Sequence, residues 1–326
     1  MLLLPPKEDK EEESDEIQEL DLGIVGHGPA GFTAALYASR AAISVACIGR
    51  DYGGQMGLAL EIENYPGFEN ISGIDLADKM RTQAEKFGTK IIYGEISTIV
   101  ITEDNRFLIK SDMGNYIVTA LIIATGGTHR ELDVPGEKEF IGRGVSYCAT
   151  CDAAFFKEKT VVVVGSGDAA ATGTLALSDV GAKKIYWTSR SDYLKCERIY
   201  VERAEERENI EILYNKQVTE IKGTNTVEEI VFNDGTTLKA DGIFAEIGAL
   251  PNTELAEALG CELEDNLVRI DDDCNTSVPG VFAAGDVTSK IKNPLNRQIT
   301  TSVGLATIAA ISAAEFLQAR KTIKKD

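Results

Sequence analysis

Two cysteines in the middle of the chain are spaced for redox chemistry. Cys148 and Cys151 stand in the run CATCD at 148–152. A Cys-x-x-Cys pair can close a small disulfide and lower the pKa of one thiol to ~7 or below, which makes a thiolate available near neutral pH. The competing interpretation is a pair of small buried side chains, since buried cysteines are common. We predict a redox-active pair.

The other cysteines lack this spacing. Cys47, Cys196, Cys261 and Cys274 stand alone, and the chain has only two histidines. A structural zinc site would need a second cysteine pair or histidines at ligand spacing. We therefore expect no metal site. In a cytosolic chain, cysteines are more often free, catalytic or metal-bound than held in structural disulfides.

A nucleotide-binding element precedes the cysteine pair. From Leu20 an apolar strand runs into GHGPAG at 26–31 and then into a helical pattern beginning near Pro29. The first glycine permits a tight turn, the second lets a pyrophosphate approach the backbone, and the third lets helix and strand pack closely. The helix N-terminus offers free N–H groups to the phosphates. The predicted contacts are Gly26, Gly28, Pro29, Ala30 and Gly31.

An acidic residue follows the next strand, SVACI, at the distance where such folds place a ribose contact. This residue is Asp51. It is a candidate ligand of the ribose, and equally a loop acid at the end of a strand.

A second unit of the same kind begins at Thr160 with TVVVVGSGDAA, in which four consecutive valines precede Gly165, Gly167 and Ala170. A continuous apolar run indicates a parallel strand buried on both faces. Strand-like segments separate the two units, and we expect VFAAGDV near the C-terminus to complete the first fold.

The predicted fold is therefore α/β, with two doubly wound Rossmann-like domains, the second inserted into the first. The expected boundaries are 20–127 with 249–320 for the first domain, 128–248 for the inserted domain carrying the cysteine pair, and 1–19 for a flexible tail.

Composition narrows the class of protein. The chain has 326 residues, 44% of them hydrophobic, and a net charge of −19. Nine acids against two lysines in the first 21 residues indicate a solvated tail. Nucleic-acid binding is not expected, because clusters of Lys and Arg are absent.

The opening MLLL is too short for a signal peptide. We also expect no segment apolar enough to span a bilayer, and we expect the run from Val303 to be a packed helix. The predicted location is cytoplasmic.

Ordered motifs continue through most of the chain. They are GHGPAG at 26–31, GGQM at 53–56, ENYPG at 63–67, ATGG at 124–127, CATCD at 148–152, GSGDAA at 165–170, TSVPGVFAAGDV at 276–287, and Arg297 with Gln298. In this order and spacing the chain resembles the low-molecular-weight thioredoxin reductases, within the two-dinucleotide-binding-domain flavoproteins, over about residues 18–318.

The resemblance implies FAD on the first fingerprint, with Gln55 and Asn64 near the flavin and Asp286 on the ribityl chain. Positive charge from Arg297 and from the following helix N-terminus would face the flavin's pyrimidine edge, where charge accumulates on reduction. The further contacts implied by the resemblance are Gly54, Ala124, Thr125, Gly126, Gly285, Gln298 and Ile299.

The resemblance also implies roles for the cysteine run. Cys151 faces the flavin and receives its electrons, Cys148 attacks the partner's disulfide, and Cys151 then resolves the mixed disulfide. Asp152 matches the family's proton donor and acceptor. The implied partner is thioredoxin or a glutaredoxin-like protein, and the implied assembly is a homodimer.

The chain departs from the family where a pyridine nucleotide would bind. A basic motif H-R-R-x-x-x-R falls here on Ser189, Arg190, Ser191 and Lys195, and two helical glutamates fall on Thr172 and Gly173. A 2′-phosphate prefers paired guanidinium groups. Three classes of electron donor stay open: NADPH, NADH, and reduced ferredoxin or a deazaflavin. The candidate pyridine-nucleotide contacts are Gly165, Gly167, Asp168, Ala169, Arg190 and Lys195.

The pair and the flavin belong to different predicted domains. Because one arrangement cannot both expose Cys148 to a protein and hold Cys151 against the flavin, we expect a domain rotation with hinges near 126–129 and 248–252. Two other functions are compatible with the sequence: an FAD-dependent dithiol oxidase and a flavin-binding redox sensor. A peroxide-reductase flavoprotein is not expected, since those relatives carry an extra N-terminal thioredoxin-like module.

Overall fold

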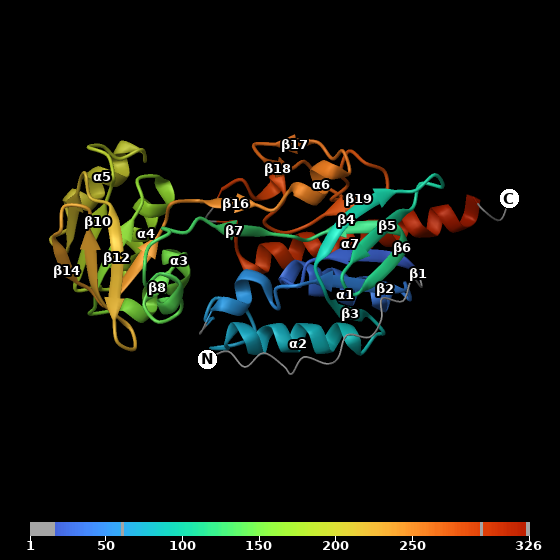
Figure 1. The fold of residues 1–326 in the computed structure, drawn as a ribbon, viewed down its shortest axis with the longest axis horizontal. Helices are drawn as coiled ribbons and strands as arrows, with labels where there is room; N and C mark the ends of the chain where they lie inside the picture. Colours follow the sequence, from blue (N-terminus) through green and yellow to red (C-terminus); the bar gives the residue numbers. More distant parts are fainter. Residues whose placement is uncertain (1–16, 60–61, 294–295, 324–326) are drawn as a thin grey trace.

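The computed structural model describes residues 17–59, 62–293 and 296–323. Two bodies of unequal size lie side by side and are joined by a narrow connection (Figure 1). The larger body contains both the first and the last described segments, and the smaller one is built from the middle of the chain. Most of the expected tail lies outside the described residues, although its last three positions, 17–19, already belong to the first strand.

The larger body is centred on a seven-stranded sheet with the order β3-β2-β1-β6-β5-β4, to which β19 adds beside β6. Strands β1, β2, β3, β6 and β19 pair in parallel, whereas β4, β5 and β6 pair antiparallel. The strands are β1 (Ile17–Val25), β2 (Val45–Gly49), β3 (Lys90–Tyr93), β4 (Ile96–Ile101), β5 (Phe107–Ser111), β6 (Gly114–Ile123) and β19 (Val281–Ala283).

Strand β19 confirms that the first fold is completed near the C-terminus. Val281 pairs with Leu121 and Ala283 with Ile123, so a strand from the end of the chain lies against one formed before the smaller body begins. The main helices of this body are α1 (Pro29–Arg40), α2 (Gly73–Glu85) and α7 (Ile299–Ile323). Short elements complete it: α6 (Glu254–Ala258), β17 (Leu263–Glu264) and β18 (Leu267–Val268).

The smaller body is built around a five-stranded parallel sheet with the order β11-β10-β9-β15-β8. Strand β9 has the two-sided burial expected of its valines: Val161 and Val163 pack into the core on one face, and Val162 into the core on the other. The strands are β8 (Val145–Ser146), β9 (Thr160–Val164), β10 (Lys184–Thr188), β11 (Ile210–Leu213) and β15 (Gly242–Ala245).

Two layers cover this sheet. On one side lie α3 (Ala149–Asp152), α4 (Asp168–Asp179) and α5 (Arg198–Glu205); on the other an antiparallel sheet of β12 (Val218–Gly223), β13 (Val227–Phe232) and β14 (Thr237–Lys239). The chain's single tryptophan, Trp187 on β10, is fully buried, and its indole N–H donates to the carbonyl of Gly165 at 2.8 Å. The fingerprint turn is thus tied to the neighbouring strand.

The connection between the bodies is a two-stranded antiparallel ribbon. Strand β7 (Gly127–His129) leaves the larger body, and β16 (Ala249–Pro251) returns to it (Figure 1). The amide of Asn252 donates to the carbonyl of Thr125 at 3.0 Å, which fixes the ribbon on the larger side. These strands coincide with the two predicted crossing points.

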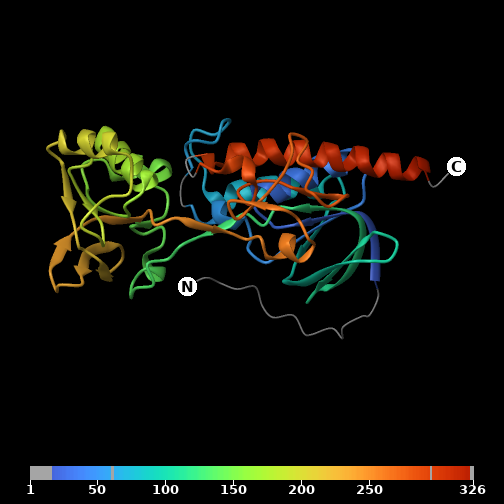
Figure 2. The same ribbon diagram turned by 90° about the horizontal axis from the view of Figure 1, so that it is seen from above.

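Helix α7 is the packed helix expected from Val303 onward, but it corrects the expectation that no segment is apolar enough to span a bilayer. By length and composition it is apolar enough to cross a membrane, with a mean hydropathy of 1.4 over an 18-residue window of Ile299–Thr322. One face of the helix nevertheless lies against the rest of the fold. Four buried alanines, with Leu317, form this packed face: Ala306, Ala309, Ala310 and Ala313. The helix lies along α1 and β6 for much of its length (Figure 2).

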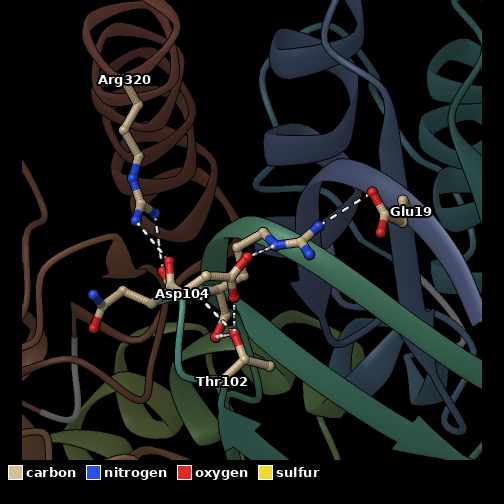
Figure 3. A network of polar contacts seen from close by, with 6 residues as sticks. Glu19, Thr102, Asp104 and Arg320 are labelled. Atoms are coloured by element: carbon tan, nitrogen blue, oxygen red, sulfur yellow. Dashed lines mark hydrogen bonds and ion pairs between the residues drawn. The ribbon is translucent and has the colours of Figure 1, made fainter. Parts of the chain in front are cut away.

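The C-terminal end of α7 is also tied to the sheet by polar contacts (Figure 3). The Arg320 guanidinium donates to the carbonyls of Asn105 and Asp104 at 2.9 and 3.2 Å. Arg106 then bridges Asp104 at 2.6 Å and Glu19 of β1 at 3.2 Å. These contacts link the last helix to the β4–β5 turn and to the first strand, as expected of a helix packed within a domain.

Candidate active site

The cysteine pair lies at the start of α3. Cys148 and Cys151 form a disulfide with their Cα atoms 5.3 Å apart. The carbonyl of Cys148 accepts the N–H groups of Cys151 and Asp152, so the first turn begins directly at the disulfide. Cys148 is half-buried and Cys151 is exposed, whereas Cys47, Cys261 and Cys274 are buried thiols. The structure therefore brings together the pair that the spacing predicted.

Asp152 closes a short polar network around Cys148. The Ser146 hydroxyl donates to Oδ2 of Asp152 at 2.7 Å and accepts the N–H of Cys148 at 3.1 Å. Burial raises the pKa of the Asp152 carboxyl, and the hydrogen bond from Ser146 partly offsets this. A carboxyl whose pKa is raised by burial, next to a redox-active pair, is suited to act as a proton donor and acceptor.

A second carboxyl, absent from the sequence prediction, lies at the other end of α3. Glu246 follows β15, and its Oε1 accepts the N–H of Ala149 at 2.7 Å. Burial raises the pKa of Glu246, the Ala149 N–H lowers it, and the Asp152 charge raises it further. The signal available in the sequence was a single acid within the apolar run GIFAEIG, at a strand end beside the second fingerprint.

The first fingerprint has the predicted close approach of helix and strand. A Cβ atom at Gly31 would lie 1.8 Å from the carbonyl oxygen of Gly26, so only glycine fits. Helix α1 begins at Pro29, and a Cβ at Gly28 would have no protein atom within 4 Å. The second glycine thus leaves open space in front of a helix N-terminus, as a pyrophosphate requires.

One cavity of 2330 Å³ spans both bodies and collects the predicted residues. Every predicted FAD contact except the buried Gly31 lines it, and so do Cys148, Cys151 and Asp152. Its size exceeds that of a typical drug-sized pocket, which is about 300–1,000 Å³, and suits an extended dinucleotide. Asp51 lies at its edge with an exposed carboxylate paired to Arg50 at 3.5 Å.

The far end of the cavity carries charge suited to a reduced flavin. Nε of Arg297 is buried without a hydrogen-bond partner among the described residues, and Asn64 donates to Gln298 at 3.3 Å. Asp286 accepts from the Ser302 hydroxyl at 3.2 Å. Burial raises the pKa of Asp286, and Arg297 and Ser302 oppose this shift. An unsatisfied guanidinium N–H, together with the cradle at Gly28, fits bound FAD.

The segment that follows β10 packs against the second fingerprint and makes hydrogen bonds to it. The carbonyl of Ser166 accepts the N–H of Lys195 at 2.7 Å, and Asp168 accepts the N–H of Glu197 at 3.1 Å. Among the six candidate pyridine-nucleotide contacts, Ala169 alone lines the cavity. Arg190 is exposed on the turn that precedes this segment. Lys195 therefore contacts the fingerprint through its backbone N–H.

The geometry has a counterpart in known proteins. A model of the pyridine nucleotide-disulphide oxidoreductases matches residues 20–313. The chain belongs to this family. Within it, the chain is 41% identical over 305 residues to the thioredoxin reductase of Bacillus subtilis, covering 91% of this chain and 95% of that protein. This pyridine nucleotide-disulphide oxidoreductase is thus a thioredoxin reductase-like flavoenzyme whose redox disulfide is Cys148–Cys151, as expected from the motifs.

Solved structures of the family agree with the nested α/β fold. The thioredoxin reductase of Streptococcus pyogenes superposes with a TM-score of 0.84 at 38% identity, covering 93% of this chain and all of that one. The Lactococcus lactis enzyme in the FR conformation has a similar identity, 37%, and covers 92% of this chain and 99% of its own, yet its TM-score is 0.65. Two relatives of nearly the same identity to this chain therefore superpose on it to different degrees.

Proposed function

We propose that the protein passes two electrons from FAD through the Cys148–Cys151 disulfide to thioredoxin or a glutaredoxin-like protein. The observation that carries this proposal is the shared cavity, which the first fingerprint and the disulfide both line. Bound FAD would supply a two-electron carrier between the donor and the disulfide. Gly26, Gly28 and the N-terminus of α1 would hold its pyrophosphate, with Arg297 and Gln298 at its flavin end.

The chemistry at the cysteines follows from the thiol–disulfide exchange. Two electrons and two protons convert Cys148–Cys151 into two thiols, and Asp152 holds a proton beside them. The Cys148 thiolate attacks a sulfur of the partner disulfide and displaces one partner thiolate, which takes up a proton. Cys151 then attacks the Cys148 sulfur, releases the partner as a dithiol and restores the original disulfide.

We further propose that residues 20–127 with 249–320 form the FAD domain, that 128–248 form the inserted domain, and that the two rotate about the β7–β16 ribbon. Two single strands are a small connection for such a movement. The lower TM-score of the Lactococcus lactis FR conformation, at 37% identity against 38% for the better-fitting relative, supports a family in which these bodies change orientation.

For the electron donor, we propose two candidate classes: NADPH, and a donor that is not a pyridine nucleotide. Arg190 and Lys195 are the cations available to a 2′-phosphate and support NADPH. A donor outside the pyridine nucleotides, such as reduced ferredoxin or a deazaflavin, is supported by the serines at 189 and 191 and by the backbone of 195–197 lying on the fingerprint.

The deciding experiment is anaerobic stopped-flow mixing of the oxidised protein with NADPH, NADH or reduced ferredoxin while flavin absorbance is followed. Fast bleaching by NADPH contradicts the alternative donor, and fast bleaching by ferredoxin alone contradicts NADPH. Thioredoxin reduction is then measured with the donor that works. Oxygen consumption driven by a small dithiol would instead identify a dithiol oxidase, and absence of catalytic transfer to any disulfide would identify a redox sensor.

We propose a cytoplasmic homodimer. Ile308 and Ile311 on the outer face of α7 are 38% and 49% exposed, which leaves apolar surface for a second copy. Sedimentation of the holoprotein tests this, with Ile308→Glu and Ile311→Glu expected to shift a dimer to monomer. A monomeric wild-type protein would contradict the proposal.

A further inference from the structure

Glu246 is fixed in place by the central sheet of the smaller body. Its backbone N–H donates to the carbonyl of Val164 at 2.8 Å, which continues the pairing of β15 with β9. A Cβ added to Gly165 would lie 2.3 Å from the carbonyl oxygen of Glu246, so the fingerprint turn also packs against this residue. The backbone that carries the Glu246 carboxylate is therefore held on two sides.

The side chain of Glu246 reaches from this sheet to the start of α3. Its Oε1 lies 2.7 Å from the backbone nitrogen of Ala149, the residue directly after Cys148. The same oxygen would lie 3.6 Å from a Cβ at Gly173 on α4. The carboxylate thus occupies the junction of the sheet, α3 and α4.

Helix α3 needs such an anchor. It spans four residues, Ala149–Asp152, and continues into a 3-10 helix at Ala153–Phe156, and helices this short are only marginally stable without tertiary contacts. At its far end, Asp152 is tied to Ser146. At its near end, the Ala149 N–H is the donor next to Cys148, and Glu246 is its acceptor. Packing against α4 at Gly173 is the third restraint.

We propose that Glu246 is a positioning residue for the redox disulfide: by accepting the N–H of Ala149, it fixes the first turn of α3 and holds the Cys148 and Cys151 sulfurs at bonding distance. This rests on the proposed thiol–disulfide exchange at the pair. Because a constrained dithiol closes its ring more readily than a mobile one, the anchor stabilises the disulfide relative to the dithiol.

The test measures the exchange equilibrium of the pair directly. Oxidised protein reacts with two glutathione molecules to give the dithiol and one glutathione disulfide, and the thiols of Cys148 and Cys151 are counted by alkylation and mass spectrometry. The protein retains its FAD, and no electron donor or thioredoxin is present. Glu246→Gln keeps an acceptor oxygen without the charge, whereas Glu246→Leu has similar size and no acceptor.

We expect Glu246→Leu to favour the dithiol about tenfold, equivalent to ~30 mV for a two-electron couple, and Glu246→Gln to remain within about twofold of the wild type. The matched control is Asp241→Asn at the other end of β15, where a carboxylate accepts the Thr160 N–H at 2.8 Å, away from α3. This variant is expected to leave the equilibrium unchanged.

A second variant removes the donor instead of the acceptor. Ala149→Pro lacks the N–H, and proline is tolerated at the first position of a helix. It is expected to shift the equilibrium in the same direction as Glu246→Leu, and the double variant to shift it no further than either single change. Ala149→Pro therefore tests the same hydrogen bond even if Glu246→Leu folds poorly.

Two results would overturn the inference: an equal shift in Glu246→Gln and Glu246→Leu, which would assign the effect to charge, or no shift in Glu246→Leu and Ala149→Pro. Either can occur while wild-type protein reduces thioredoxin, in which case only the role of Glu246 is wrong. Failure of the wild-type protein to reduce any protein disulfide would instead contradict the proposed function.

Discussion

Gly173 on α4 lies directly against Ala149 at the start of α3, so closely that a Cβ on the glycine would come within 2.6 Å of the alanine Cβ. Intrinsic helix propensity disfavours glycine by about 0.5–1 kcal/mol relative to alanine. The contact explains why a glycine nevertheless occupies this position, since the helix that carries the disulfide could not otherwise pack here.

We therefore predict that Gly173→Ala destabilises the protein by about 1–3 kcal/mol, because overpacking outweighs the gain in propensity. Gly304→Ala on α7 is the control, made in the Ile311→Glu background because Gly304 lies on the proposed dimer face; within one subunit its Cβ would have no other residue within 4 Å. It is expected to stabilise by about 0.5–1 kcal/mol. Urea unfolding measures the free energy of unfolding of both variants, which should fall for Gly173→Ala and rise for Gly304→Ala. A rise for Gly173→Ala would show that α3 can move aside at little cost.

Gly28→Ala separates cofactor binding from folding. The backbone at Gly28 is extended (φ −77°, ψ −179°), which alanine adopts freely, and its Cβ would meet no protein atom within 4 Å. The apoprotein should therefore keep its melting temperature, while FAD affinity falls at least about tenfold because the methyl group occupies the place of the pyrophosphate. Fluorescence titration with FAD measures this. Unchanged affinity would move the pyrophosphate elsewhere.

Asp152→Asn should lower turnover about 10²–10⁴-fold, the usual contribution of a positioned proton donor and acceptor. Stability should respond in the opposite sense. Because burial raises the pKa of Asp152 in the folded protein, the folded state retains the proton more strongly than the unfolded chain. Stability is therefore lost as pH rises from the unfolded pKa, ~3.9, through the folded one.

The asparagine variant lacks this ionisation, so it should melt at a higher temperature than the wild type near pH 7, and the difference should disappear below about pH 4. Thermal melts across this range test the sign. A variant that loses stability at pH 7 and gains it at low pH would contradict a raised pKa.

Gly248 lies where the chain leaves the smaller body, with φ +100°, a region that residues with a Cβ rarely adopt. Gly248→Ala should strain the connection by about 1–3 kcal/mol and so alter the balance between the two orientations that we propose for the bodies. We expect multiple turnover with thioredoxin to fall about fivefold or more while FAD content stays constant. Gly235→Ala, with φ +79° in an exposed turn, is the control. Equal activity of both variants would contradict a hinge here.

Local patterns in the sequence predicted much of this molecule. The fingerprints, the run of valines in β9 and the Cys-x-x-Cys spacing each arise from constraints within a few neighbouring residues, and the structure places them as expected. The first nucleotide-binding fold is incomplete where the second begins at Thr160, so a later segment had to complete it, and β19 does so.

Contacts between distant segments were not predictable in this way. Glu246 and Ala149 are separated by 97 positions, and an acid at a strand end gives no sign of which N–H it will accept. The same holds for Gly173, whose partner is known only once α3 and α4 are packed. The run from Val303 is a packed helix as expected, but the expectation that no segment is apolar enough to span a bilayer was wrong, because α7 also carries large aliphatic residues such as Ile308 and Ile311 outside its packed face.

The position of Trp187 makes it an intrinsic fluorescent reporter of the distance between the two bodies. The chain's one tryptophan is buried in the smaller body, hydrogen-bonded to Gly165, while the cradle at Gly28 belongs to the larger one. Indole emission overlaps flavin absorption, so with FAD bound at the proposed site excitation energy would pass from one body to the other with an efficiency that depends on their separation and orientation. A change in the relative placement of the bodies would thus be visible in the unlabelled holoprotein as a change in tryptophan lifetime.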